Sequence, residues 1–315
     1  MTLRDLTQMF STDEQCRALL VKLRWPNGVE CLRCKSTNIF ELVSYSKFEC
    51  KECLYQFSVT TQTIFHDTHL PLDTWFTAVL LIVEARKGMS AMQVKRTLWG
   101  QHKGSYKTAW YLCHRIRAAM AEASKGQEML SGSVEIDECY VGGKRKGVGR
   151  GHGIDNKIPV IGFKERGGRT RFIAARDLDQ EKLYDLIAKN VDSTVDVIMT
   201  DESKLYNFGL TAHHKVKHER VNHSAGEYVR GDVTTNGIES AFSLLKRGIM
   251  GTWHKISVKH LPAYLQEMTF RFDRRNNTDI FMDTLRHMIT APVLTFEKLT
   301  TNLPATQGNE VAVPF

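Results

Sequence analysis

The positions of three acidic residues suggest that they take part in chemistry. Asp137 lies inside VEIDECYVGG, an expected strand, and strands are depleted in aspartate. Asp201 directly follows the short apolar run VDVIMT, and sites in layered sheets often form at strand ends. Glu239 stands near the start of an expected helix, NGIESAFSLLKRG. Three converging carboxylates can hold two Mg²⁺ or Mn²⁺ ions about 4 Å apart, the arrangement that supports phosphoryl transfer.

Taken singly, these acids have simpler explanations. Asp201 fits a helix cap, and Glu239 fits an exposed residue of a first helical turn. Two neighbours are alternatives for the site itself. Glu135 shares a strand face with Asp137, and the amide oxygen of Asn236 can replace Glu239 as the third ligand. The hypothesis of a two-metal site therefore depends on all three acids lying together.

Lys246 is the cation expected beside these acids. It follows Glu239 by seven residues, which is two helical turns, so the two side chains share one helix face. A lysine in that position can reach a phosphate that lies near the acid.

A second group of residues indicates a zinc site. Cys31-x2-Cys34 and Cys50-x2-Cys53 form two hooks in a chain that has seven cysteines. Two such hooks at this separation are typical of four-sulfur zinc sites. Four sulfur ligands leave no open position, so this single Zn²⁺ is expected to be structural. Chance spacing and a redox CxxC are the alternatives.

The expected elements alternate in a way that favours helices packed on a sheet. Short β-like pieces stand between the cysteine pairs, and three helices are expected over 72–85, 91–98 and 105–124. From residue 131 the order β-β-β-α-β-α-β-α predicts an α+β or α/β layer fold. The expected strands are 134–141, 158–164, 169–176, 195–199 and 216–221, and the expected helices are 180–191, 204–212, 238–249 and 260–276.

The helical segment resembles a helix-turn-helix, with Lys107 and Arg115 on its last helix. A recognition helix needs basic and polar side chains on its outer face. A three-helix packing module explains the same pattern about as well.

Composition narrows the classes of protein. The net charge of +8 and the 25 % of charged residues are compatible with nucleic-acid binding and argue against wholesale disorder. No apolar run approaches the ~20 residues of a membrane span, and no secretory signal opens the chain. Together with the free cysteines this predicts a reducing, cytoplasmic location without membrane association.

Several motifs together give the chain a family resemblance. They are CLRC…CKEC, VEIDECYVGGK, IMTDES and NGIESAFSLLKRGIMGTWHKISVKHLPAYLQEMTFRF. The chain resembles the DDE-type transposases of bacterial insertion sequences that carry an N-terminal zinc ribbon, a group related to the Merlin elements. The resemblance spans about residues 10–300, and Asp273 stands where we expect asparagine.

This resemblance implies a ribonuclease-H-like catalytic domain. It implies that Asp137, Asp201 and Glu239 hold the two Mg²⁺ or Mn²⁺ ions and that Lys246 lies near the phosphate. It also implies that two basic groups contact double-stranded DNA, namely the glycine-rich loop with Lys144, Arg145, Lys146 and Arg150, and the cluster Arg271, Arg274 and Arg275.

The activity implied is cleavage of DNA at the element ends, followed by attack of the freed 3′-OH on target DNA. Cutting and joining two ends implies a homodimer or a larger assembly, associated with the bacterial nucleoid. The alternatives are a DNA-binding regulator derived from a transposase and a nuclease or resolvase that does not join strands. The expected domains are a zinc ribbon over 1–65, a helical DNA-binding segment over 66–130, the catalytic domain over 131–300 and a tail over 301–315.

Overall fold

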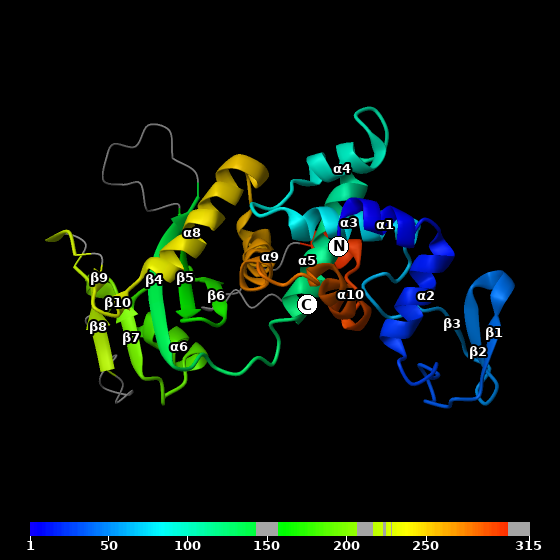
Figure 1. Ribbon diagram of the computed structural model, residues 1–315, viewed down its shortest axis with the longest axis horizontal. Coiled ribbons are helices and arrows are strands. Elements are labelled where there is room, and N and C mark those ends of the chain that lie inside the picture. Colours follow the sequence, from blue (N-terminus) through cyan, green and yellow to red (C-terminus); the bar gives the residue numbers. More distant parts are fainter. Residues whose placement is uncertain (143–156, 207–216, 223–224, 228, 302–315) are drawn as a thin grey trace. The chain divides into compact units, whose positions relative to one another are not determined.

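The computed structural model describes residues 1–142, 157–206, 217–222, 225–227 and 229–301, which form two compact units (Figure 1). The first unit holds Met1–Ala123 together with the described residues from Asn276 onward, and the second holds Ser124–Arg275. Among the described residues, no helix has the length and apolarity needed to cross a membrane.

This division differs from the domain boundaries expected from the sequence. The zinc ribbon and the helical segment share one unit, and two late helices complete it: α10 (Ile280–Thr290) and α11 (Phe296–Thr300). The last helix expected from the sequence ends at residue 276. However, Phe281, Leu285 and Met288 recur at helical spacing and are buried in α10. That apolar face packs against helices of the first unit, which draws α10 away from the sheet-bearing unit.

The first unit combines a small sheet with helices, several of which begin at side-chain caps. Thr2 and Thr12 each form a capping box, and Ser90 accepts the Gln93 N–H at the start of a third helix. The antiparallel strands pair in the order β1-β2-β3. The elements are α1 (Leu3–Met9), α2 (Asp13–Arg24), β1 (Ile39–Leu42), β2 (Lys47–Cys50), β3 (Gln56–Phe57), α3 (Leu72–Glu84), α4 (Ala91–Trp99) and α5 (Tyr106–Glu122).

Helix α5 is largely enclosed by its neighbours, which differs from an exposed recognition helix. It contacts α3, α4 and α10, and most of its side chains from Ala109 to Ala121 are buried. The helical segment itself is confirmed. The packing explanation of its pattern describes α5 better than the recognition-helix explanation, because a recognition helix keeps one face open to DNA.

The second unit is built on a five-stranded mixed sheet in the order β6-β5-β4-β7-β8. Strand β4 pairs antiparallel with β5, which pairs antiparallel with β6, whereas β4, β7 and β8 run parallel. This mixed sheet with its helices confirms the layered fold of strands and helices expected from the sequence. The strands are β4 (Ser133–Val141), β5 (Ile158–Glu165), β6 (Thr170–Ala174), β7 (Val197–Thr200) and β8 (Lys217–Arg220).

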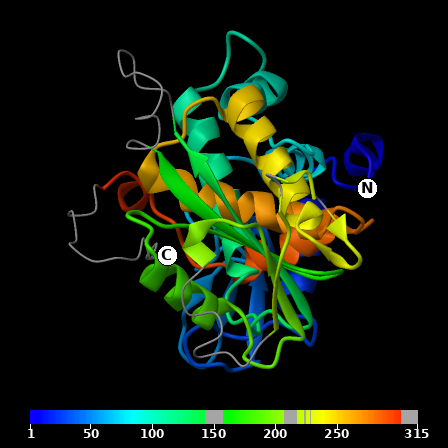
Figure 2. The same ribbon diagram turned by 90° about the vertical axis from the view of Figure 1, so that its left-hand side faces the viewer.

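Helices cover both faces of this sheet (Figure 2). Helix α6 (Gln180–Asn190) packs over Val134 and Ile136 on one face. Helices α8 (Asn236–Gly248) and α9 (Leu261–Asp273) pack over Cys139 and Val160 on the other. Because side chains of β4 alternate between the faces, Glu135 and Asp137 lie on the side of α8. The remaining short elements are β9 (Val229–Arg230), β10 (Val233–Thr234), η1 (Val43–Tyr45), η2 (Lys204–Tyr206), η4 (Ile249–Trp253) and η5 (Val258–His260).

A glycine on β5 allows α8 to lie close to the sheet. Gly162 is the cross-strand partner of Asp137, so it faces the same helix. A Cβ at this position would lie 2.5 Å from Ile238 Cδ1 and 2.7 Å from Phe242 Cζ. A larger residue would therefore push α8, and Glu239 with it, away from β4.

We expect Gly162→Ala to lower the free energy of unfolding by about 1–3 kcal/mol, because the added methyl group overpacks the contact with α8. Gly251→Ala is the matched control, since a Cβ there meets no heavy atom within 4 Å. Urea unfolding of both variants measures the difference. Equal stability of the two would show that α8 does not depend on this close approach.

Candidate active site and zinc site

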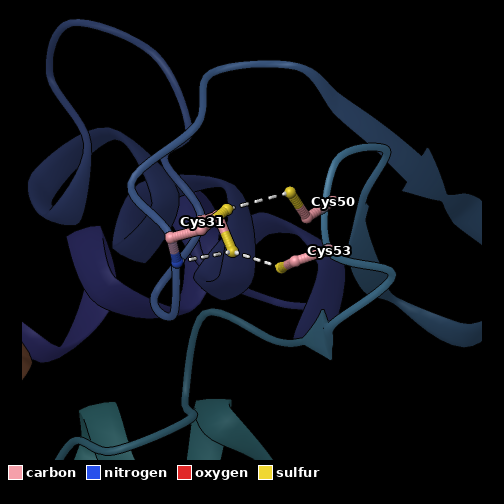
Figure 3. A group of neighbouring side chains, drawn as sticks. Cys31, Cys50 and Cys53 are labelled. Atoms are coloured by element: carbon pink, nitrogen blue, oxygen red, sulfur yellow. Dashed lines mark hydrogen bonds between the residues drawn. The ribbon is translucent and has the colours of Figure 1, made fainter.

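The four cysteines of the two hooks converge as the sequence predicts. Figure 3 shows Cys31, Cys50 and Cys53 pointing toward a common centre. Their sulfur atoms all lie within 4.8 Å of one another. Cys31 Sγ is 3.6 Å from Cys53 Sγ, and Cys34 Sγ is 3.5 Å from Cys50 Sγ. A tetrahedral zinc ion with Zn–S bonds of about 2.3 Å places its sulfurs roughly 3.8 Å apart. The four sulfurs therefore fit a structural Zn²⁺.

Both hooks fold into the same turn. Lys35 N–H donates to Cys31 O at 3.0 Å, and Leu54 N–H donates to Cys50 O at 2.9 Å. Lys35 and Leu54 each take a positive φ, of 62° and 58°. Burial opposes ionisation of Cys31, yet the backbone N–H groups of Cys34 and Arg33 donate to its sulfur and lower its pKa to about 6. A thiolate is the form that binds zinc.

In the second unit, strand register brings two of the expected acids together. Glu135 on β4 is the parallel partner of Met199 on β7. Continuing that register by two residues places Asp137 opposite Asp201, the first residue after β7. Neighbouring strands lie about 4.8 Å apart, and residues two positions apart share a face. Both carboxylates therefore lie on the side of the sheet that α8 covers.

A buried carboxylate joins the start of α8 to β4. Glu135 is 3 % exposed, and its Oε2 accepts the Ile238 N–H at 2.9 Å. A Cβ on Gly237 would lie 2.7 Å from this oxygen, so glycine is needed for the approach. Arg166 Nη2 lies 3.5 Å from the other oxygen, Oε1. Glu135, the alternative acid on the same strand face as Asp137, is thus engaged in positioning α8.

Helix α8 then follows β4 in the same direction. Its start meets Glu135, and Leu245 near its end packs in one cluster with Cys139. The path from residue 135 to 139 is about 13 Å in a strand, and that from 238 to 246 is about 12 Å in a helix. Because these two lengths are nearly equal, Glu239 lies alongside Asp137 and Lys246 lies alongside Cys139.

The third acid is held by its own helix cap. Thr235 is buried, its Oγ1 donates to Glu239 Oε1 at 2.7 Å, and its carbonyl oxygen accepts the Glu239 N–H at 3.0 Å. Asn236 is exposed, whereas Glu239 is half-buried. This placement favours Glu239 over Asn236 as the partner of the two aspartates.

Electrostatics show that the three acids share one environment. Burial raises the pKa of Asp137 to about 7. The negative charges of Glu138, Asp201 and Glu239 contribute to this rise. Their oxygens are spaced more widely than the sulfurs, because among the described residues only the cysteines form a group of three or more such ligands within 4.8 Å. Charge repulsion among carboxylates is the effect that a divalent cation relieves.

A chain of hydrogen bonds fixes the turn that carries Asp201. Its Oδ1 accepts the Ser203 N–H at 3.0 Å, and the buried Thr200 hydroxyl donates to the Asp201 carbonyl oxygen at 2.7 Å. His218 Nε2 lies 2.9 Å from the same hydroxyl. Burial, then the charge of Arg220, lowers the pKa of His218 to about 4, so at neutral pH its uncharged ring donates to Thr200.

Sequence reasoning missed the role of Glu138. This residue points to the face opposite Asp137, where Tyr206 Oη donates to its Oε2 at 2.6 Å. Burial raises the pKa of Glu138, and the nearby charge of Asp201 adds to the rise. In the sequence, only its position next to Asp137 pointed to this residue. The fold shows that Asp137 and Glu138, on opposite faces of β4, are both near the charge of Asp201.

Lys246 lies where the helix geometry places it, near the end of β4. Burial raises the pKa of the Cys139 thiol to about 12, and the positive charge of Lys246 acts against that rise. Lys246 is exposed at its position on α8. It is therefore an exposed cation two helical turns beyond Glu239, beside Cys139.

The expected DNA contacts divide into three groups. Lys107 and Arg275 are exposed, and Arg274 is half-buried over the Phe270 ring at 4.0 Å. Arg115 and Arg271 are buried, at 4 % and 5 % exposure. Residues 143–156, which include Lys144, Arg145, Lys146 and Arg150, lie outside the described residues.

Burial gives Arg115 and Arg271 different tasks from DNA contact. Arg115 Nη2 donates to His66 O at 2.6 Å, and Arg271 forms an ion pair of 3.1 Å with the fully buried Glu267. A phosphate contact requires an exposed guanidinium, so these two residues do not suit it. Asp273 accepts the Thr170 N–H at 2.9 Å, a backbone contact within the second unit.

Two known families match stretches of the chain that include the residues of both sites. Residues 129–273 match the ISXO2-like transposase domain, and residues 11–56 match the transposase zinc-ribbon domain. These two stretches are thus similar to a transposase zinc ribbon followed by an ISXO2-like transposase domain. The transposase domain match contains Asp137, Asp201 and Glu239, and the zinc-ribbon match contains all four cysteines.

A curated relative comes from an archaeal mobile element. An uncharacterized protein in transposable element ISH50 of Halobacterium salinarum is 29 % identical over 280 residues, which covers 83 % of this chain and 91 % of the relative. A chain of the simian T-cell lymphotropic virus intasome in complex with PP2A regulatory subunit B56 gamma is 14 % identical, with a TM-score of 0.25 over 74 % of this chain and 75 % of that one. At that score the backbones share too little geometry to support a conclusion.

We expect zinc chelation to unfold the ribbon over residues 31–53 and to leave the sheet of the second unit folded. The ribbon core is small, so metal binding supplies much of its folding free energy. Hydrogen exchange before and after chelation measures this, with β4 and β5 as the internal reference. Cys34→Ser should lose the zinc seen by native mass spectrometry, and Cys113→Ala, at a buried cysteine outside the hooks, should keep it. Unchanged protection of the ribbon after chelation would rule out a structural zinc.

We expect Glu135→Ala to destabilise the chain by about 2–4 kcal/mol, because it leaves the buried Ile238 N–H without its acceptor. Glu135→Gln keeps an acceptor oxygen and should cost less than about 1.5 kcal/mol. Urea unfolding gives both values, and hydrogen exchange at the start of α8 locates the effect. If the glutamine variant is as unstable as the alanine variant, the acceptor is not what the residue supplies.

Proposed function

We propose that the chain is the transposase of an insertion sequence, which cleaves DNA at the element ends and joins the freed 3′-OH to target DNA. The transposase domain match and the three acids on one face of the sheet support this proposal. The observation that carries it is the strand register that sets Asp137 opposite Asp201 beneath α8. A bacterial host and a relationship to the Merlin elements are part of the same proposal.

Asp137, Asp201 and Glu239 would hold two Mg²⁺ or Mn²⁺ ions. Such ions would supply positive charge for the attacking and leaving oxygens of an in-line phosphoryl transfer. The protein supplies the positions of the acids: β4 and β7 align two of them, and Thr235 orients the third. Lys246 contributes a positive charge for the phosphate next to the reacting one.

The partner in this proposal is double-stranded DNA, first the element ends and then the target. Lys107, Arg274 and Arg275, and the basic loop at 144–150, are the proposed backbone contacts. Two ends must be cut and joined together, which requires at least a homodimer on the DNA. Binding through phosphates of this kind weakens steeply as salt rises.

The test is to incubate the purified chain with Mg²⁺ or Mn²⁺ and labelled duplexes from the DNA that flanks its gene. We expect metal-dependent cutting and joining that Asp201→Asn abolishes. Lys246→Ala should slow turnover, while the rise in melting temperature on adding Mg²⁺ remains. Binding without chemistry in the parent chain would favour the DNA-binding regulator, and cutting without joining would favour a nuclease.

One matched pair of variants identifies the third acid. Glu239→Gln should abolish cutting because it removes a charged ligand, whereas Asn236→Ala, three residues earlier on the same helix, should cut like the parent. The reverse result would assign the position to Asn236.

A further inference from the structure

The turn that follows α8 has features that the site described above does not explain. No acidic residue occurs between Glu239 and Glu267, whereas four lysine or arginine residues do: Lys246, Arg247, Lys255 and Lys259. Met250 lies in the middle of this stretch at 78 % exposure, and no large hydrophobic side chain in the described part of the chain is more exposed. Arg247, His254 and Lys255 around it are also exposed.

The backbone of this turn is irregular and strained. Residues Ile249–Trp253 form a π-helical turn in which His254 N–H donates to Ile249 O at 2.7 Å. His254 has φ 57° and ψ −58°, and the Lys255 N–H donates to Trp253 O at 2.6 Å. A γ-turn of this hand is rare, and such a conformation costs about 1–3 kcal/mol at a residue other than glycine.

The core of the second unit holds the turn in place. Trp253 is 8 % exposed and packs edge-on against Tyr264 with ring centroids 5.0 Å apart. Its buried Nε1 has no hydrogen-bond partner among the described residues, which adds a further cost. Anchored at Trp253, the turn keeps Met250 in solvent. Strain of this kind is typical of functional segments.

We propose that the turn Arg247–Lys255 binds duplex DNA, with Arg247 and Lys255 on phosphates and Met250 packed against the nucleotides. This inference rests on the proposed function, because it places the contact on the DNA that enters the carboxylate site. Apolar side chains, methionine among them, are inserted between base steps by many DNA-binding proteins. A protein partner fits less well, because one exposed methionine between Gly251 and the half-buried Ile249 offers far too little apolar area for a stable protein interface.

The helix sets the distance between this contact and the reacting bond. Eleven residues separate Glu239 from Met250, which corresponds to about 16 Å along a helix. At 3.4 Å per base pair this is roughly five base pairs of duplex. The turn is therefore expected to contact DNA within half a helical turn of the cleaved phosphate.

The experiment measures the affinity of the full chain for a mixed-sequence 40-base-pair duplex over a range of salt concentrations, in the Asp201→Asn background so that no cleavage intervenes. Arg247→Ala with Lys255→Ala should reduce the slope of log affinity against log salt by about 2, one for each lost phosphate contact. Lys182→Ala with Lys189→Ala is the control. It removes the same charge from α6, on the opposite face of the sheet, and should leave the slope near that of the background chain.

The contribution of Met250 to DNA binding is tested separately from that of Arg247 and Lys255. Met250→Ser should weaken binding roughly five- to tenfold with an unchanged salt slope, and Met250→Leu should restore the affinity. These side chains are exposed, so folding is expected to survive, and single Arg247→Gln and Lys255→Gln variants replace the pair if circular dichroism shows otherwise.

Two outcomes separate the inference from the proposed function. The inference alone is overturned if the background chain binds normally and the Arg247/Lys255 pair has the same salt slope as the control pair. It is also overturned if the Met250→Ser and Met250→Leu variants bind with equal affinity. Absence of DNA binding by the background chain contradicts both the inference and the proposed function.

Discussion

The contact between Glu135 and the first turn of α8 is the constraint on which the arrangement of the second unit depends. Glu135 Oε2 accepts the Ile238 N–H, and Gly237 on the helix leaves room for this contact. Gly162 on β5 lets the next turn of α8 pack closely on the sheet. The N-terminus of a helix carries a partial positive charge, so a buried anion is favourable there. With the helix start fixed, every later side chain on its inner face acquires a defined position along β4.

The two sites of the chain obtain their geometry in opposite ways. The sheet, the helix and their hydrogen bonds position the acids, whose mutual repulsion opposes the arrangement. The ribbon has a small core of Phe48, Phe57 and the buried cysteines, and its hooks are shaped by local turns that aim four sulfurs at one point. The acids therefore depend on the fold for their positions, whereas the ribbon is expected to depend on its zinc ion to complete its fold.

Local patterns in the sequence were enough to predict the zinc hooks, the helical segment and, in the second unit, the five strands of the sheet and helices α6, α8 and α9. Of the helix expected over 204–212, only the 3-10 turn Lys204–Tyr206 lies within the described residues. The pairing of Asp137 with Asp201 was less accessible, because it follows from strand register across 64 residues rather than from spacing. Burial was the least predictable property. From the sequence, Arg115 and Arg271 were expected to be surface cations. In the fold, Arg115 donates to the His66 carbonyl oxygen and Arg271 forms an ion pair with Glu267. The placement of α10 was missed for the same reason, since its apolar face fits helices more than 150 residues earlier in the chain.

The return of α10 and α11 to the first unit has a consequence for synthesis. The second unit is an insertion within the first, because the chain leaves the first unit after Ala123 and re-enters it at Asn276. Domains fold as units during translation, N-terminal parts first. Here the helices that emerge first cannot bury their full apolar surface until the ribosome has passed α10. A product truncated before residue 276 would thus carry an incomplete N-terminal unit.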